Sequence, residues 1–212
     1  MRIDEIMQYV RLEMPGAPDF IITQNIAAVA NDFCNRTRVW NEIQQPIAMR
    51  DGVSQYDIEP PVGARAIGVS EVWQGDRQLV GVTQSTLSSV LPEWQTARAP
   101  APLYFNVAND HRLITVYPRP DLAMRAKLTL RVILTPKRTA QELPDFLIDE
   151  HLDALVCGTK ARMFAQVNVP WSNQMTAPSL TNTYDQAVTD ARIKELHGNV
   201  TSSLRVTPRR FG

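Results

Sequence analysis

The chain has 212 residues, of which 44% are hydrophobic and 21% charged. This is ordinary globular usage, so extensive disorder is not expected, and the length suffices for one good core with a smaller second domain. Lys plus Arg (22) balance Asp plus Glu (22), which excludes the global basic field of a general nucleic-acid binder.

Cysteine usage and hydropathy argue against a disulfide-rich protein and a membrane-spanning protein. Cys34 and Cys157 lie far apart in apolar helical patterns, which favours buried free thiols over a disulfide framework. No signal-peptide pattern follows Met1, and no apolar run approaches the roughly 20 residues that span a bilayer. We therefore expect a soluble protein, made in a reducing cytoplasm, with no membrane partner.

Two helices are predicted at the start of the chain. Ile3, Ile6, Val10 and Met14 recur at helical spacing, and the prolines of residues 15–18 end that helix. A second helix is expected over about residues 21–36, with a stripe of Ile22, Ile26, Val29 and Phe33.

From residue 40 to about 136 the pattern predicts short strands. Asp51-Gly52 predicts a hairpin between residues 46–50 and 53–58, and Gly75-Asp76 predicts another between 66–74 and 77–82. Asn109-Asp110 separates the strands around 103–107 and 112–117. The strict alternation of residues 127–134 predicts a strand with one buried face and one solvated face, as in an antiparallel sheet or small barrel.

Two segments between these strands differ from them. Residues 83–90 predict a short helix capped by Thr83 or Ser85. Residues 96–102, with two prolines, predict a contact loop.

Helical patterns return after Leu143-Pro144. One helix is expected to run to about Val167 on a stripe of Ile148, Leu152, Leu155, Val156, Thr159 and Met163. A polar loop over residues 171–179 then leads to a last helix over about 180–197, closed by Gly198. The apolar stripe of that helix contains Tyr184, Ala187, Val188, Ala191 and Leu196.

The order of these elements predicts an α+β fold. Residues 1–44 and 139–198 would form a helical bundle from both chain ends, with an antiparallel β-sheet or small barrel inserted over residues 45–138. Residues 199–212 lack acidic residues and contain too little apolar surface to fold alone, which predicts an extended basic tail.

Catalytic motifs are mostly missing from the sequence. The three histidines are not at metal-ligand spacing, and there is no nucleophile elbow, phosphate-binding loop or dinucleotide fingerprint, so we expect no enzyme, no cofactor and no metal. Asp145, Asp149 and Asp153 recur every four residues and form an acidic ridge. A solvated helix face is its ordinary interpretation, a subunit interface is a second, and acid–base chemistry around Asp149 and Glu150 is a third. Trp171, in its polar loop, suits core and interface equally well.

Four stretches in order resemble the head-to-tail adaptor, or connector, proteins of tailed bacteriophages, particularly the short-tailed type. They are residues 30–40 (ANDFCNRTRVW), 72–75 (VWQG), 114–120 (ITVYPRP) with the strand that follows, and Leu143-Pro144 with 158–163 (GTKARM) and 170–173 (PWSN). The likeness covers about residues 19–197, and none of these motifs is catalytic.

The resemblance implies a structural virion protein in the neck. A ring of about twelve copies would dock on the portal protein and connect it to tail or nozzle proteins, leaving a channel through which genomic DNA passes without sequence-specific binding. The C-terminal tail would bind the portal through Arg205, Arg209, Arg210 and Phe211. Asp145, Asp149, Asp153 and Trp171 are then candidates for the subunit interface.

Three alternatives stay open at this point. The chain could be another tail or neck completion protein with the same fold plan. A weaker alternative is a hydrolase that uses Asp149 and Glu150. A small DNA-binding protein is a third, although the three arginines of the tail would make few phosphate contacts.

Overall fold

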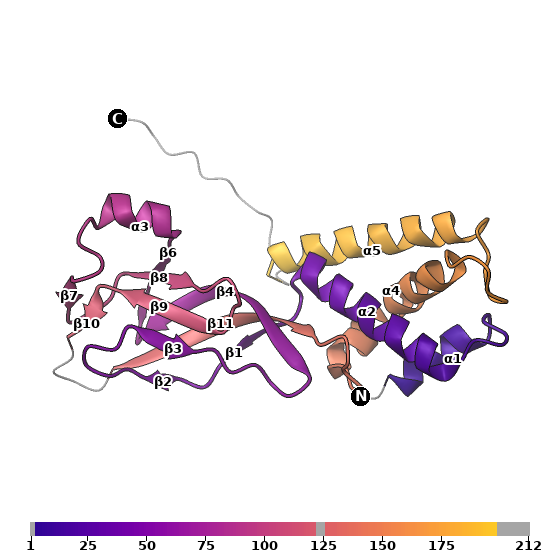
Figure 1. The fold of residues 1–212 in the computed structure, drawn as a ribbon, viewed down its shortest axis with the longest axis horizontal. Coiled ribbons are helices and arrows are strands. Elements are labelled where there is room, and N and C mark those ends of the chain that lie inside the picture. Colours follow the sequence, from indigo (N-terminus) through magenta and orange to yellow (C-terminus); the bar gives the residue numbers. More distant parts are fainter. Residues whose placement is uncertain (1–2, 122–125, 199–212) are drawn as a thin grey trace. The chain divides into compact units, whose positions relative to one another are not determined.

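The computed structural model describes residues 3–121 and 126–198, and within them the fold is α+β, as the sequence predicts (Figure 1). The chain forms two compact units: Met1–Val39 with Glu142–Gly212, the helical unit, and Trp40–Gln141, the β unit. The predicted tail over residues 199–212 lies outside the described residues.

The helical unit packs helices from both ends of the chain against one another. Its helices are α1 (Asp4–Arg11), α2 (Asp19–Thr37), α4 (Asp145–Phe164) and α5 (Ala177–Leu196). As Figure 1 shows, α4 packs along α5, and α2 lies against both. The apolar stripes predicted for the first two helices are buried. This confirms that the residues at helical spacing form the faces that pack into the core.

Several helix details differ from the predictions. The first helix ends at Arg11 rather than Met14, although Met14 is still buried. The last helix begins at Ala177, because a proline in the first turn is compatible with helix. Leu196, predicted in its buried stripe, is 64% exposed, because α5 ends there.

The fourth helix is kinked. His151 has φ −132° and ψ 18°, which interrupts the helical geometry one third of the way along α4. Leu152 and Val156, predicted for one straight apolar stripe, are accordingly only half-buried, while Leu147 and Ala154 are buried.

The β unit contains two main sheets and one short helix. Its elements are β1 (Asn41–Ile43), β2 (Ile47–Ala48), β3 (Gln55–Asp57), β4 (Ala64–Gln74), β5 (Arg77–Gln78), β6 (Val80–Gly81), α3 (Gln84–Val90), β7 (Arg98–Ala99), β8 (Tyr104–Val107), β9 (Leu113–Tyr117), β10 (Arg119–Pro120) and β11 (Lys127–Pro136). One sheet has the order β1-β11-β4-β5 with β2 also beside β11, and the other has the order β3-β9-β8-β6.

The strand β11 follows its predicted alternation on the buried face only. Leu128, Leu130, Val132 and Leu134 have no exposed surface, as predicted. On the face predicted to be solvated, Lys127 is exposed, but Thr129 and Arg131 are half-buried and Ile133 is buried.

The hairpin β8–β9 forms as predicted, and the Thr83 hydroxyl caps α3 by accepting from the Thr86 N–H (3.2 Å). The hairpin predicted between residues 66–74 and 77–82 forms only in part, because β5 pairs with β4 whereas β6 pairs in parallel with β8 of the other sheet.

The hairpin predicted at Asp51-Gly52 is wrong. The turn exists, with Gly52 at φ 69°, but its two strands belong to different sheets, since β2 pairs with β11 and β3 with β9. Tyr56 and Ile58 are buried where β3 pairs with β9. We infer that burial of these side chains, rather than the turn, selects β9 as the partner of β3. The predicted loop over residues 96–102 is partly wrong too, because it contains β7, which pairs in parallel with β10.

Candidate functional site

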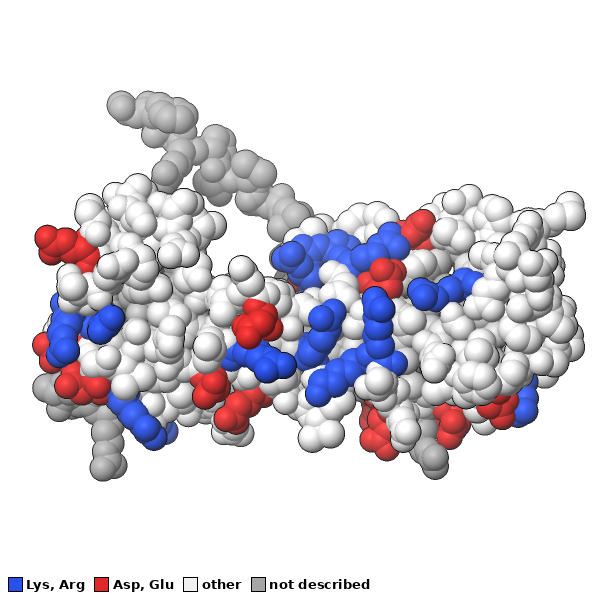
Figure 2. Space-filling model, in the orientation of Figure 1, with Lys and Arg blue, Asp and Glu red and all other residues white. Residues whose placement is uncertain are grey.

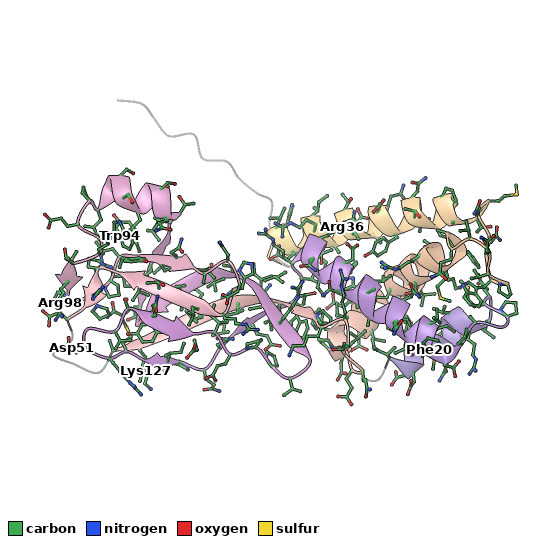
Figure 3. All side chains as sticks on the ribbon, viewed as in Figure 1. Phe20, Arg36, Asp51, Trp94, Arg98 and Lys127 are labelled. Carbon is green, nitrogen blue, oxygen red and sulfur yellow. The ribbon has the colours of Figure 1, made fainter. Side chains whose placement is uncertain are left out.

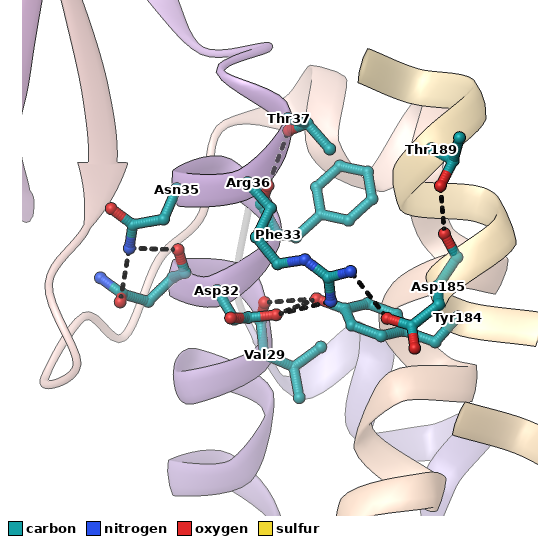
Figure 4. A network of polar contacts seen from close by, with 10 residues as sticks. Val29, Asp32, Phe33, Asn35, Arg36, Thr37, Tyr184, Asp185 and Thr189 are labelled. Atoms are coloured by element: carbon teal, nitrogen blue, oxygen red, sulfur yellow. Dashed lines mark hydrogen bonds and ion pairs between the residues drawn. The ribbon is translucent and has the colours of Figure 1, made fainter. Parts of the chain in front are cut away.

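The helical unit is fixed by polar contacts between α2 and α5 (Figure 4). The Arg36 guanidinium pairs with Asp185 on α5 (2.7 Å) and lies 3.5 Å from Asp32, one turn back on α2. The Tyr184 hydroxyl donates to the Asp32 carboxylate at 2.9 Å. Figure 3 shows Arg36 beside α5 and Phe20, which is 62% exposed, at the other end of α2. These contacts hold α5 in a defined register on α2.

A glycine lets α4 approach the same contact. A Cβ on Gly158 of α4 would lie 2.7 Å from the Tyr184 ring and 2.8 Å from a Val29 methyl, closer than real side chains come. The absence of a side chain at this position therefore allows α4 to pack directly against Tyr184 and α2.

The C-terminal ends of α2 and α5 are basic. Arg192 donates to the Thr37 carbonyl at 3.1 Å, which satisfies a free carbonyl at the end of α2, and it also pairs with Glu195 at 2.8 Å. Arg38 follows in the left-handed conformation (φ 59°) and is exposed. In Figure 2, Lys and Arg side chains gather over these helix ends, where the helix dipole favours positive charge.

A groove with several acidic side chains lies at the kink of α4, against α5. This α4–α5 groove has a volume of about 550 Å³. Its lining residues are Ile148, Asp149, Glu150, His151, Leu152, Asp153, Ala154, Ala187, Asp190, Ala191 and Lys194. Four of them are carboxylic acids and one is a lysine, so the groove presents a negatively charged surface.

Two contacts define the chemistry of the groove. Lys194 donates to Glu150 at 2.6 Å, and this hydrogen bond lowers the pKa of Glu150. The His151 ring lies 4.9 Å from the Phe33 ring, and burial lowers the pKa of His151. At neutral pH the groove therefore combines an ionised Glu150, paired with Lys194, with a neutral His151 imidazole at its kinked wall.

The groove includes two of the four predicted interface residues. Asp149 and Asp153 line it, whereas Asp145 is exposed at the start of α4 and Trp171 is half-buried in the α4–α5 loop. The kink falls between Asp149 and Asp153, so the straight ridge predicted from their spacing is interrupted. Trp171 donates from Nε1 to the side chain of Gln166 at 3.1 Å. Arg205, Arg209, Arg210 and Phe211 lie outside the described residues.

The groove residues on α5 were missed by sequence reasoning. Asp190 and Lys194 are four residues apart on the exposed face, and the small Ala187 and Ala191 leave space beside the kink. Their spacing alone marks one helix face, but the partner helix could be identified only from the structure.

Glu150 is not tuned as a general acid. A general acid near neutral pH is favoured by a raised pKa, and the pKa of Glu150 is lowered instead. Within residues 3–121 and 126–198, no three His, Cys, Asp or Glu side chains are grouped so as to hold a metal ion. No helix in that part of the chain is long and apolar enough to cross a membrane.

Comparisons with known proteins leave the family open: no protein-family model matches the sequence, and no curated protein matches it significantly.

Proposed function

We propose that the chain is a structural virion protein, a head-to-tail adaptor that binds as a ring to the portal of a tailed bacteriophage and connects it to the tail. One observation carries the proposal. Helices from both ends of the chain form one unit and the β unit is inserted between them, which is the organisation that the sequence resemblance implies. Genomic DNA would pass through the lumen of the ring without being read.

The charge distribution of the helical unit supports a ring. A closed ring needs two different faces on each copy, because copies meet head to tail. The α4–α5 groove offers an acidic face, and the exposed Arg38 at the end of α2 offers a basic one. Opposite charges on the two faces would steer and orient neighbouring copies. About twelve copies is the number that the resemblance implies.

We assign the portal contact to residues 199–212. Arg205, Arg209 and Arg210 would pair with acidic portal groups, and Phe211 would fill an apolar pocket as an anchor. Each segment is short, but the copies of a ring bind together, so their avidity exceeds the affinity of one segment.

Electron microscopy of negatively stained mixtures with the portal ring from the same virus tests the assignment. We expect the full chain to add a ring of density to the portal. A full-length variant with Arg205, Arg209 and Arg210 each changed to Glu should lose that density, and so should a chain that ends at Gly198. No added density with the full chain would overturn the adaptor proposal. If the full chain adds no density to the portal but binds tail proteins, the result would favour a tail or neck completion protein.

The subunit contact is tested separately. Asp149→Lys with Asp153→Lys should prevent rings, whereas Asp76→Lys, an exposed turn residue of the β unit, should not. If the Asp149→Lys, Asp153→Lys variant still forms rings, the α4–α5 groove is not part of the subunit interface. If the chain turns over a hydrolase substrate and the Asp149→Ala, Glu150→Ala variant does not, the result would instead support the enzyme alternative.

A further inference from the structure

The outer edge of β3 carries unpaired backbone positions. In an antiparallel ladder, residues alternate between those that bond to the partner strand and those whose N–H and C=O point away from it. Val116 N–H donates to the Ser54 carbonyl (2.8 Å) and Ile58 N–H to the Arg112 carbonyl (2.8 Å), so the even-numbered residues face β9. The backbone groups of Gln55 and Asp57 therefore point outward. Among the described strands, β3 is the last of its sheet.

The edge of β1 has the same property. Leu134 N–H donates to the Trp40 carbonyl (2.8 Å) and Gln44 N–H to the Leu130 carbonyl (2.9 Å), so even-numbered residues again face the partner, β11. Asn41 and Ile43 present their backbone groups on the other side. β1 also ends its sheet within the described residues.

A groove of about 710 Å³ lies between these two edges, and we call it the β-edge groove. Its lining residues are Glu42, Ile43, Gln44, Gln45, Pro46, Ile47, Ala48, Arg50, Val53, Gln55, Tyr56, Asp57, Glu59 and Pro61. Figure 1 shows β3 running beside β2 here, and Figure 3 marks Asp51 at the turn between them.

Side-chain hydrogen bonds fix both ends of the groove. The Tyr56 hydroxyl donates to the Val53 carbonyl (2.7 Å) and accepts from the Arg50 N–H (3.4 Å), which fixes the turn end. At the other end the Gln44 side chain donates to the Glu59 carbonyl (2.9 Å). Each bond joins a side chain to a backbone group of Val53, Arg50 or Glu59, and none of them involves the backbone of Gln55, Asp57 or Ile43.

Apolar and acidic side chains share the rim of the groove. Ile43 is 60% exposed and Val53 38%, which is unusual for large apolar residues beside a free edge. Glu42, Asp57 and Glu59 outnumber the single cation, Arg50. An extended segment with alternating apolar residues and several positive charges has the matching chemistry.

The chain itself contains such a segment. In residues 199–212 the apolar Val200, Leu204 and Val206 would share one face of an extended strand with Ser202, and Val and Thr favour strands. The segment has three arginines and no acid. Every copy has one groove and one segment, so two copies can exchange segments reciprocally.

We propose that the β-edge groove binds residues 199–212 of a second copy as an added strand, in the protein that is not docked on a portal. Backbone hydrogen bonds go to Gln55 and Asp57, the apolar side chains contact Ile43 and Val53, and the arginines meet Asp57 and Glu59. This proposal does not depend on the adaptor assignment, although a portal would compete for the same segment.

Site-specific photocross-linking tests the proposal. Full chains carry a photoreactive phenylalanine in place of Ile43, or in place of Val90 on α3 as the matched exposed control. After irradiation without portal, mass spectrometry should identify residues 199–212 joined to position 43 in a product of dimer mass. Position 90 should give no such product. Cross-links to other segments, equal yield at position 90, or a product of monomer mass only would each overturn the proposal.

Charge reversal provides the second arm. Asp57→Arg with Glu59→Arg should reduce the cross-link yield several-fold, and Arg205→Glu with Arg209→Glu in the same chain should restore it. A yield unchanged by reversal would remove the ionic contacts from the proposal, and failure of the rescue would do the same. Portal docking without the cross-link overturns only the groove assignment, whereas the cross-link without portal docking overturns only the adaptor assignment.

Discussion

The helical unit and the β unit differ in where their backbone hydrogen-bonding groups lie. In the helical unit, backbone groups are paired within each helix, and side chains such as Arg36 and Tyr184 join one helix to the next. In the β unit, Gln55 and Ile43 lie on strand edges that face a groove with outward backbone groups. Substitutions in the α2–α4–α5 contact should therefore cost stability, and substitutions in the β-edge groove should cost binding.

Gly158→Ala should have the largest effect. The added Cβ would meet the Tyr184 ring at 2.7 Å and Val29 at 2.8 Å, and overpacking of this kind typically costs about 1–3 kcal/mol. Helix propensity returns up to about 1 kcal/mol of that loss. We expect a net loss of roughly 1–2 kcal/mol in the free energy of unfolding, measured by urea denaturation.

Gly68→Ala in β4 is the matched control from the other unit. Its Cβ would lie 3.7 Å from Ile133, an ordinary contact, so its effect should stay within about 0.5 kcal/mol. An equal loss in both variants would show that the helical contact is no tighter than the sheet.

Tyr184→Phe should cost less, about 1 kcal/mol, because it removes one hydrogen bond to Asp32. Tyr9→Phe, at a residue that is 52% exposed, is the control and should leave the unfolding midpoint unchanged. A Tyr184→Phe midpoint equal to wild type would mean that packing alone holds α5.

The same residue predicts an alkaline pH dependence. Burial, with help from the Asp32 charge, raises the pKa of Tyr184 above its ordinary value near 10. The folded chain then retains the phenol proton where the unfolded chain loses it. This contribution to stability is complete below about pH 10 and decreases as pH rises further. Tyr184→Phe should flatten that decrease in denaturation curves recorded from pH 9 to 11.

Local patterns predicted much of this fold. Period-3.6 stripes identified α1, α2, α4 and α5, and alternation identified β11, because most residues of each stripe lie on a buried face. The exceptions are Leu152 and Val156 beside the kink of α4 and Leu196 at the end of α5. The Asp51-Gly52 turn was predicted, but its hairpin was not formed. Positive φ at Gly52 is a local property, whereas the choice of β11 and β9 as strand partners depends on distant residues.

The candidate sites depended even more on long-range contacts. The Arg36–Asp185 pair and the Lys160–Glu13 pair at 2.7 Å join residues far apart in sequence, and spacing does not reveal them. The kink at His151 was also missed, although it separates Asp149 from Asp153 and shapes the α4–α5 groove. The β-edge groove had no sequence signal at all, because it forms where two sheets end.

Asp57→Lys should have the smallest effect on stability. Asp57 is exposed on the edge of β3, and surface substitutions away from caps and buried networks usually change the free energy of unfolding by less than about 0.5 kcal/mol. The same variant should lose affinity for a synthetic peptide of residues 199–212, measured by fluorescence anisotropy, with Asp76→Lys as the control of equal charge change. A large loss of stability in Asp57→Lys would mean that the edge is a structural part of the β unit, and the contrast with the helical unit would fail. If Asp57→Lys keeps its stability and loses peptide binding, the edge of β3 serves binding and not the fold. The α2–α4–α5 contact would differ, because substitutions there lower the free energy of unfolding.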